Sequence, residues 1–291
     1  MIATEEIRLS MQEKIEEIRK KEGHNTSSHG FASLYIWKKE MGLSVALEKD
    51  TFLVRYRGAG EHAWFFPCGD KNGKKKMIET LMRDQDLCFY YMRTEDVQFL
   101  EMEFPGLFQI EACEESHEYF YNRKEQEELQ GRKYAAHRNH IRRAMQEGNL
   151  RVEVLNENNV KSAMQVCRCW SCQVKSESEQ TDFCAAMGLL DEWRELKVSG
   201  IMVYLEEEPY AVAAGYALTE DTFDLALAKQ KSMVSGLSVY TKHQLISSLP
   251  KRFLWINAEE DLGIPGLRTM KQQMKPAGMI KMYKGSLKRL G

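Results

Sequence analysis

The chain has 291 residues, of which 43% are hydrophobic and 29% charged, and its formal net charge is -2 at pH 7. This composition excludes a disordered or collagen-like chain, and the length predicts two domains. The near-neutral charge also argues against a uniformly basic nucleic-acid binder, so each segment has to be considered separately for charge.

The first 23 residues are charged at helical spacing and contain no apolar stretch, which argues against a secretory signal. No apolar run approaches the roughly 18 residues that cross a bilayer. We therefore expect a cytoplasmic protein without a transmembrane segment, either free or peripheral at the membrane. Cys169 and Cys172 lie near one another on a predicted helix, but Cys167 falls on a different side and no second cysteine pair at zinc spacing follows, so we expect no metal site there.

The pattern of apolar residues predicts the same mixed α/β order twice. In the first half we expect helices near 3–22, 31–40, 74–85 and 94–103, and strands near 44–50, 51–58, 62–69, 87–93 and 107–115. In the second half we expect strands near 150–156, 199–208, 209–220, 222–230, 252–257 and 278–287, and helices near 158–173, 181–197, 236–249 and after Pro265. These elements predict a first domain over residues 1–125 and a second over residues 126–291.

A basic segment, residues 131–145, follows the expected domain boundary and contains no acidic residue. Its helical pattern places Tyr134, Ile141 and Met145 on an apolar stripe. The polar residues that it offers to a polyanion are Arg132, Lys133, Arg138 and Asn139. The alternative is a solvated helix face without a ligand.

The segment 256–276 ends a strand in a glycine-containing turn and opens a helix at Pro265. Gly263 and Gly266 permit tight backbone geometry, and the amides at the start of the helix can hold an anion. Arg268 and Lys271 are three residues apart and add positive charge to one face. The alternative is a structural turn between a strand and a helix.

These two segments resemble the interdomain and C-terminal signatures of stand-alone proteins related to the C-terminal domain of phosphatidylglycerol lysyltransferases. The first signature covers residues 131–134 and 138–141, and the second covers Asn257, residues 260–263, residues 265–268, Lys271 and Pro276. The resemblance implies two tandem GNAT acyltransferase-like domains with mixed sheets, joined by the basic helix. It places the pocket in the second domain, between splayed strands that end near Lys229 and Asn257.

The resemblance further implies transfer of an aminoacyl group from aminoacyl-tRNA to a lipid headgroup or a small-molecule acceptor. It suggests Glu260, Asp261 and Asn257 as catalytic residues, with Glu260 or Asp261 orienting the donor amino group or acting as base. Arg268 and Lys271 would hold a phosphate or an acidic headgroup.

Two other functions remain open at this point. An acetyl-CoA-dependent N-acetyltransferase is disfavoured because the stretch 230–236 lacks the glycine spacing that cradles a pyrophosphate. The other alternative is a noncatalytic binding module on the same fold.

Overall fold

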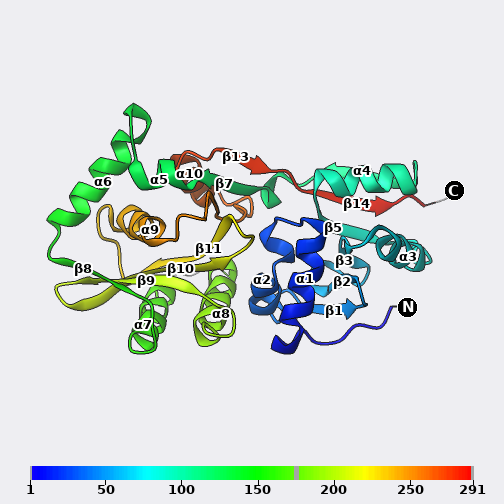
Figure 1. Cartoon of the computed structure of the whole chain (residues 1–291), viewed down its shortest axis with the longest axis horizontal. Helices are drawn as coiled ribbons and strands as arrows, with labels where there is room; N and C mark the ends of the chain where they lie inside the picture. Colours follow the sequence, from blue (N-terminus) through cyan, green and yellow to red (C-terminus); the bar gives the residue numbers. More distant parts are fainter. Residues whose placement is uncertain (1, 174–176, 290–291) are drawn as a thin grey trace. The chain divides into compact units, whose positions relative to one another are not determined.

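The structure is a computed structural model that describes residues 2–173 and 177–289, and it contains two α/β units, each built on its own sheet (Figure 1). Unit 1 comprises Met1–Glu118, Glu260–Arg268 and Met279–Gly291, and unit 2 comprises Tyr119–Glu259 and Thr269–Gly278. The expected fold class, two α/β domains with mixed sheets, is confirmed. This division into units differs from the predicted single domain boundary after residue 125, because the chain returns to unit 1 at Glu260 and again at Met279.

The sheet of unit 1 has the order β1-β2-β3-β5-β14-β6, and β4 pairs with β2 beside it. Parallel pairing joins β3 to β5, whereas β14 is antiparallel to both β5 and β6. The strands are β1 (Leu43–Leu47), β2 (Thr51–Tyr56), β3 (Ala63–Phe65), β4 (Cys68–Gly69), β5 (Cys88–Met92), β6 (Phe108–Ala112) and β14 (Tyr283–Leu287).

Four α-helices flank this sheet, and their apolar residues supply much of its core. The α-helices are α1 (Gln12–Glu22), α2 (Phe31–Trp37), α3 (Lys71–Leu81) and α4 (Thr94–Glu103), and the 3-10 turns are η1 (Leu9–Met11), η2 (Ser27–His29), η3 (Arg57–Ala59) and η4 (Glu114–Ser116). Met77, Ile78 and Leu81 of α3 join Phe89 and Leu100 in one buried cluster. Tertiary packing of these apolar faces therefore fixes the positions of short elements that would be marginal alone.

The sheet of unit 2 has the order β13-β7-β12-β11-β10-β9-β8. Its strands are β7 (Glu118–Asn122), β8 (Leu150–Val154), β9 (Ser199–Leu205), β10 (Glu208–Ala217), β11 (Thr222–Gln230), β12 (Trp255–Asn257) and β13 (Gly278–Ile280). β7 was not expected from the sequence. The prediction of a single strand over 278–287 is wrong. This segment forms two strands, because β13 pairs with β7 whereas β14 belongs to the other sheet.

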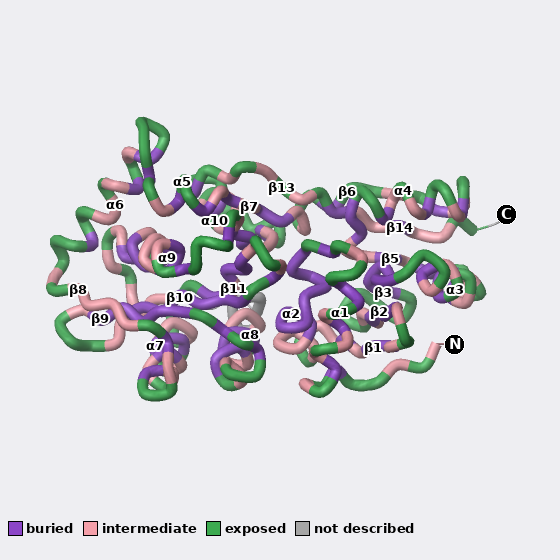
Figure 2. The backbone as a smooth tube through the Cα atoms, in the orientation of Figure 1, coloured by how far each residue is buried: buried purple, intermediate pink, exposed green. Residues whose placement is uncertain are grey.

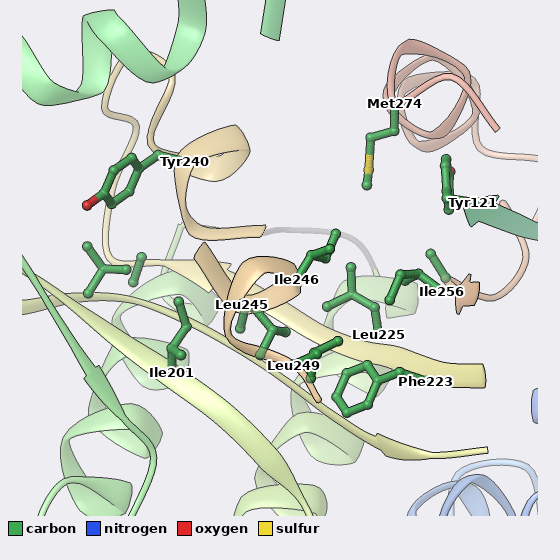
Figure 3. Close-up of a cluster of buried hydrophobic side chains, with 14 of the residues drawn as sticks. Tyr121, Ile201, Phe223, Leu225, Tyr240, Leu245, Ile246, Leu249, Ile256 and Met274 are labelled. Carbon is green, nitrogen blue, oxygen red and sulfur yellow. The ribbon is translucent and has the colours of Figure 1, made fainter. Parts of the chain in front are cut away.

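Helices cover both faces of the central strands of unit 2, with α7 and α8 on one face and α9 on the other (Figure 1). The helices are α5 (Arg123–Glu128), α6 (Ala135–Gln146), α7 (Val160–Ser171), α8 (Glu177–Asp191), α9 (Leu237–Ser248) and α10 (Pro265–Gln273), and η5 (Arg132–Tyr134) precedes α6. Within unit 2, the central strands β9 and β10 contain the longest runs of buried residues, 200–204 and 211–216 (Figure 2). On the α9 face, Phe223, Leu245 and Ile256 meet in a buried apolar cluster (Figure 3).

Candidate functional site

A fork between two parallel strands lies in unit 2. β11 pairs with β12 over Thr222–Asp224 and Trp255–Asn257, and β11 then continues alone on that side to Gln230. Asp224 and Asn257 are partners in register at the last paired position. Both are buried, at 0% and 1% exposure. Buried polar side chains at the end of a pairing are typical of a functional site rather than of an apolar core.

Asp224 also pairs in register with Tyr216 on the neighbouring strand β10. Tyr216 is 4% exposed. The Asn257 side-chain oxygen accepts a 2.7 Å hydrogen bond from the Glu259 amide and so shapes the turn that leaves β12. Asn257 was predicted as a site residue and Asp224 was not. The signal for Asp224 is an acidic residue inside the otherwise apolar strand sequence of residues 222–228.

Two predicted lysines of unit 2 are held by specific contacts. Lys229, on β11, pairs with Asp182 of α8, and its ammonium lies 3.8 Å from the centre of the Trp170 ring. Lys271, on α10, is 6% exposed and donates to the carbonyl of Ala258, just after β12. The side chains of Lys229 and Lys271 are thus fixed at the two strands that form the fork.

Lys242, which sequence reasoning missed, is buried in unit 2 like Lys271. It lies on α9, is 6% exposed, and its ammonium is 3.2 Å from the Met270 sulfur and 3.9 Å from the Met274 sulfur. Burial, followed by the positive charges of Lys271 and Lys229, lowers the pKa of Lys242 to about 8. Thioether sulfurs are weak acceptors, so the charged form is poorly compensated.

The signature turn after β12 is organised around Asp261, which belongs to unit 1 and is 0% exposed. Its carboxylate accepts from the Gly263 amide at 2.9 Å and from Nε and Nη2 of Arg268 at 2.8 and 3.1 Å. The backbone is left-handed at Leu262 (φ 53°) and Gly263 (φ 70°). The buried carboxylate therefore holds the guanidinium of Arg268 in a fixed orientation, while the Arg268 side chain is 40% exposed. Gly266, also predicted here, is exposed at the start of α10.

Glu260, the residue before Asp261, acts on two tyrosines of unit 1. Burial raises the pKa of Tyr91 well above its usual range, and the negative charge of Glu260 raises it further. The pKa of Tyr56 is raised by the same two causes in the same order. Glu260 and Asp261 were predicted together; Asp261 is engaged with Arg268, whereas the negative charge of Glu260 raises the pKa values of Tyr56 and Tyr91.

The basic helix divides into cations with structural contacts and cations on the surface. Arg138 donates to the carbonyls of Leu129 and Gly131, the second at 2.9 Å, and so closes the turn that precedes α6. Lys133 pairs with Glu125 at 2.7 Å. Arg132 and Asn139 are exposed, as are Arg142 and Arg143.

The expected apolar stripe of the basic helix is partly wrong. Tyr134 is buried, but Met145 is 61% exposed. Helix α6 buries His137 and Ala144 instead, because it packs against α9 with a face that is rotated from the expected one. Met145 therefore lies on the same exposed surface as the arginines.

The loop before α9 shows how closely this segment packs. Gly236 has φ 77°, and a Cβ there would lie 1.9 Å from the His140 carbonyl oxygen. Glycine is therefore required for contact with α6. This role of Gly236 differs from that of the pyrophosphate-cradling glycines that acetyl-CoA enzymes use at this position.

The cysteines of α7 are dispersed. Cys167 is buried and burial raises the pKa of its thiol to about 12, whereas Cys172 is exposed. His62, Asp84 and Asp86 of unit 1 bring ligand atoms within 4.8 Å of one another, but Asp86 pairs there with Arg289.

The sequence matches the family described as phosphatidylglycerol lysyltransferase, C-terminal, over residues 19–284. The chain belongs to this family. The resemblance inferred from the two signatures is thereby confirmed. Membership supports an acyltransferase-like function.

Three solved structures are similar to this fold over nearly the whole chain. A conserved protein of unknown function from Bacteroides thetaiotaomicron is 22% identical with a TM-score of 0.89, covering 99% of this chain and 100% of that one. L-PGS from Bacillus licheniformis is 16% identical with a TM-score of 0.66, covering 99% and 94%. The C-terminal domain of a putative lysylphosphatidylglycerol synthetase from Agrobacterium fabrum is 12% identical with a TM-score of 0.66, covering 96% and 92%.

Among curated proteins, none matches this member of the family significantly. Within residues 2–173 and 177–289, no helix is both long and apolar enough to cross a membrane.

Proposed function

We propose that this chain is an aminoacyltransferase that moves an aminoacyl group from aminoacyl-tRNA to a lipid headgroup or a small-molecule acceptor. The family supports the class of reaction, and the signature turn supports the substrate chemistry. The observation that carries the proposal is the Asp261–Arg268 pair.

Arg268 offers a fixed positive charge in the signature segment. A buried carboxylate that accepts from two guanidinium nitrogens orients the arginine before any substrate binds, which lowers the entropy lost on binding. The planar guanidinium group presents N–H donors in a fork that can donate two hydrogen bonds to one phosphate. In this proposal Arg268 binds an acceptor phosphate or the phosphate of the terminal nucleotide of the donor, and Asp261 is a positioning residue rather than the base.

The exposed cations of η5 and α6 support tRNA as the donor carrier. Arg132, Arg142 and Arg143 are exposed, whereas Arg138 and Lys133 are engaged in the local contacts described above. Binding through phosphates releases counterions, so affinity falls steeply with salt. We expect Arg142→Glu with Arg143→Glu to weaken tRNA binding and to lower the salt slope by about one for each phosphate that the variant no longer neutralises.

The reaction balances without a covalent enzyme intermediate. The acceptor oxygen or nitrogen attacks the carbonyl carbon of the aminoacyl ester, the bond to the ribose oxygen breaks, and the acceptor proton passes to that ribose oxygen. What the protein has to supply is orientation and stabilisation of developing negative charge. A cofactor is not needed for this balance.

The direct test uses tRNA charged with radiolabelled lysine or alanine, and vesicles that contain phosphatidylglycerol or an aqueous extract of small amines and alcohols as acceptor. We expect label to move into one acceptor fraction and uncharged tRNA to accumulate. Arg268→Ala should reduce the rate at least about 100-fold, because a charged hydrogen-bonded contact is worth about 3 kcal/mol in such sites. Arg83→Ala, an exposed arginine elsewhere in unit 1, is the matched control and should leave the rate unchanged.

Two results would contradict the proposal. One is an Arg268→Ala protein that is folded and transfers the label at the wild-type rate. The other is the absence of transfer from either charged tRNA to any acceptor fraction, combined with acetylation of an amine when acetyl-CoA is added.

A further inference from the structure

Three helices of unit 2 line a small pocket. Its polar residues are Gln126 of α5, His137 of α6, and Lys242 and His243 of α9, and Met274, which follows α10, is among its apolar residues. The volume of the pocket is about 20 Å³, which is room for one water molecule or a small ion. Because polar side chains contribute to the lining, we expect the pocket to hold a polar occupant.

Lys242 places a buried positive charge at this pocket. Its ammonium lies 3.2 Å from the sulfur of Met270 and 3.9 Å from the sulfur of Met274, and both are weak acceptors. In the part of the chain that the structure describes, no carboxylate pairs with Lys242, and the charges that act on it, those of Lys271 and Lys229, are positive as well. A buried ammonium in such surroundings is stabilised most by an anion beside it.

His137 adds a second group that lacks a partner. The side chain is 7% exposed, and its Nδ1 is buried with no hydrogen-bond partner among residues 2–173 and 177–289. Burial, followed by the positive charge of Lys275, lowers the pKa of His137, so the ring is neutral at pH 7. A neutral imidazole can carry its one proton on Nδ1, from which it donates to an anion.

The other polar groups at the pocket are already engaged. His243 donates from Nε2 to the carbonyl of Glu127 at 3.0 Å, and its neutral ring has no second N–H. The carboxylate of Glu127 pairs with Lys251 at 2.6 Å. Gln126 donates to the backbone carbonyl of Met274 at 2.6 Å. An anion in the pocket therefore takes its donors from the two side chains described above.

We propose that this pocket of unit 2 binds a small monovalent anion of about the size of chloride, held by Lys242 and His137. The anion supplies a counter-charge for the Lys242 ammonium on α9 and accepts a hydrogen bond from Nδ1 of His137 on α6. It thereby links α9 to the basic helix. A pocket of this size has no room for a nucleotide or a lipid headgroup, so the anion site is separate from the donor and acceptor sites of the proposed function and does not depend on them.

Thermal melting of the full chain at pH 7 tests the site by comparing sodium chloride with sodium gluconate, whose anion is too large for the pocket. A ligand that binds only the folded protein raises the melting temperature with a saturable dependence on its concentration. In gluconate, Lys242→Met should be more stable than wild type, and chloride should reduce this difference as it fills the wild-type site. General salt effects act on both proteins, so the difference between them reports the site.

Three variants assign the site. Lys242→Met removes the ammonium, and its apparent affinity for chloride should fall at least about 10-fold. His137→Phe keeps a ring against Tyr134, whose ring centre is 5.5 Å away, but removes Nδ1 and should weaken the affinity about 5-fold. Lys275→Met is the matched control, because it removes an exposed charge that acts on His137, and its affinity should stay within about 3-fold of wild type.

Diffraction from crystals soaked in bromide provides a second measurement that needs no variant. An anomalous peak beside Nζ of Lys242 supports the proposal, whereas peaks confined to the exposed arginines of α6 overturn it. The proposal is also overturned if chloride stabilises wild type and Lys242→Met equally at every concentration, which is the result expected of a pocket that holds only water. Equal losses of chloride affinity in Lys275→Met and Lys242→Met would overturn it too, because the effect would then be one of general surface charge.

Discussion

Replacing Lys242 by methionine should stabilise the protein at neutral pH. The ordinary lysine pKa of 10.5 is lowered to about 8 by burial and by the charges of Lys271 and Lys229. Because one pKa unit is worth about 1.4 kcal/mol, the charged ammonium costs the folded state about 3 kcal/mol at pH 7. Methionine has a similar length and fits among Met270 and Met274, so Lys242→Met removes this cost without opening a large cavity.

The same substitution should change how stability depends on pH. Between pH 8 and 10.5 the unfolded wild-type chain holds a proton on Lys242 that the folded chain has released, so its free energy of unfolding rises with pH in that window. Below pH 8 the full cost of the buried charge remains. In Lys242→Met this rise should disappear.

Urea denaturation in chloride-free buffer at pH 7, 8, 9 and 10 measures both effects. Lys161→Met, at an exposed position of α7, is the matched control and should change the free energy of unfolding by less than about 0.5 kcal/mol at every pH. The reasoning is refuted if Lys242→Met lowers stability at pH 7, or if wild type and Lys242→Met show the same rise between pH 8 and 10. Either result would mean that the ammonium is compensated in the folded state.

Three further changes have definite expected outcomes. Gly236→Ala should lower the free energy of unfolding by more than about 2 kcal/mol in urea titrations, because φ is 77° and the new Cβ would lie 1.9 Å from the His140 carbonyl oxygen. Burial lowers the pKa of His29 from 6.5 to about 4, so between these pH values the unfolded state binds a proton that the folded state does not, and the free energy of unfolding falls as the pH drops from 6.5 to 4. His29→Gln should flatten this fall in acid titrations followed by circular dichroism. Asp261→Asn should raise the KM for the phosphate-bearing substrate about 10-fold or more by releasing Arg268, and an unchanged KM in steady-state assays would refute the positioning role.

Elements with strong local signals were predictable from the sequence. Helix α4 was expected over 94–103 and spans Thr94–Glu103, and the Asp96 carboxylate in its first turn accepts a hydrogen bond from the backbone amide of Arg93 just before the helix. The strand β7 was missed because it has five residues and its partner β12 lies more than 130 positions later in the chain. The separation of β13 from β14 was missed for a related reason: local alternation of apolar residues predicts a strand but does not say which sheet it joins.

The candidate site was predictable where one segment carries it. Asp261 and Arg268 are seven residues apart, and the turn between them brings them together, so the sequence motif contains the whole pair. Lys242 on α9 and His137 on α6 come from distant segments, and their chemistry depends on burial. Burial cannot be determined from residue types alone, which is why the pocket that they line emerged only from the structure.

The sheets of both units contain a short parallel strand pair, but different side chains lie where the pairing ends. A parallel strand pair in each sheet, β3–β5 in unit 1 and β11–β12 in unit 2, stops after three residue pairs. At that point unit 1 places the ring of Tyr91 under the influence of Glu260, whereas unit 2 fixes Lys229 and Lys271 near its fork. Both ammonium groups are already engaged, Lys229 with Asp182 and Lys271 with the Ala258 carbonyl, and the fork itself contains the buried carboxylate of Asp224.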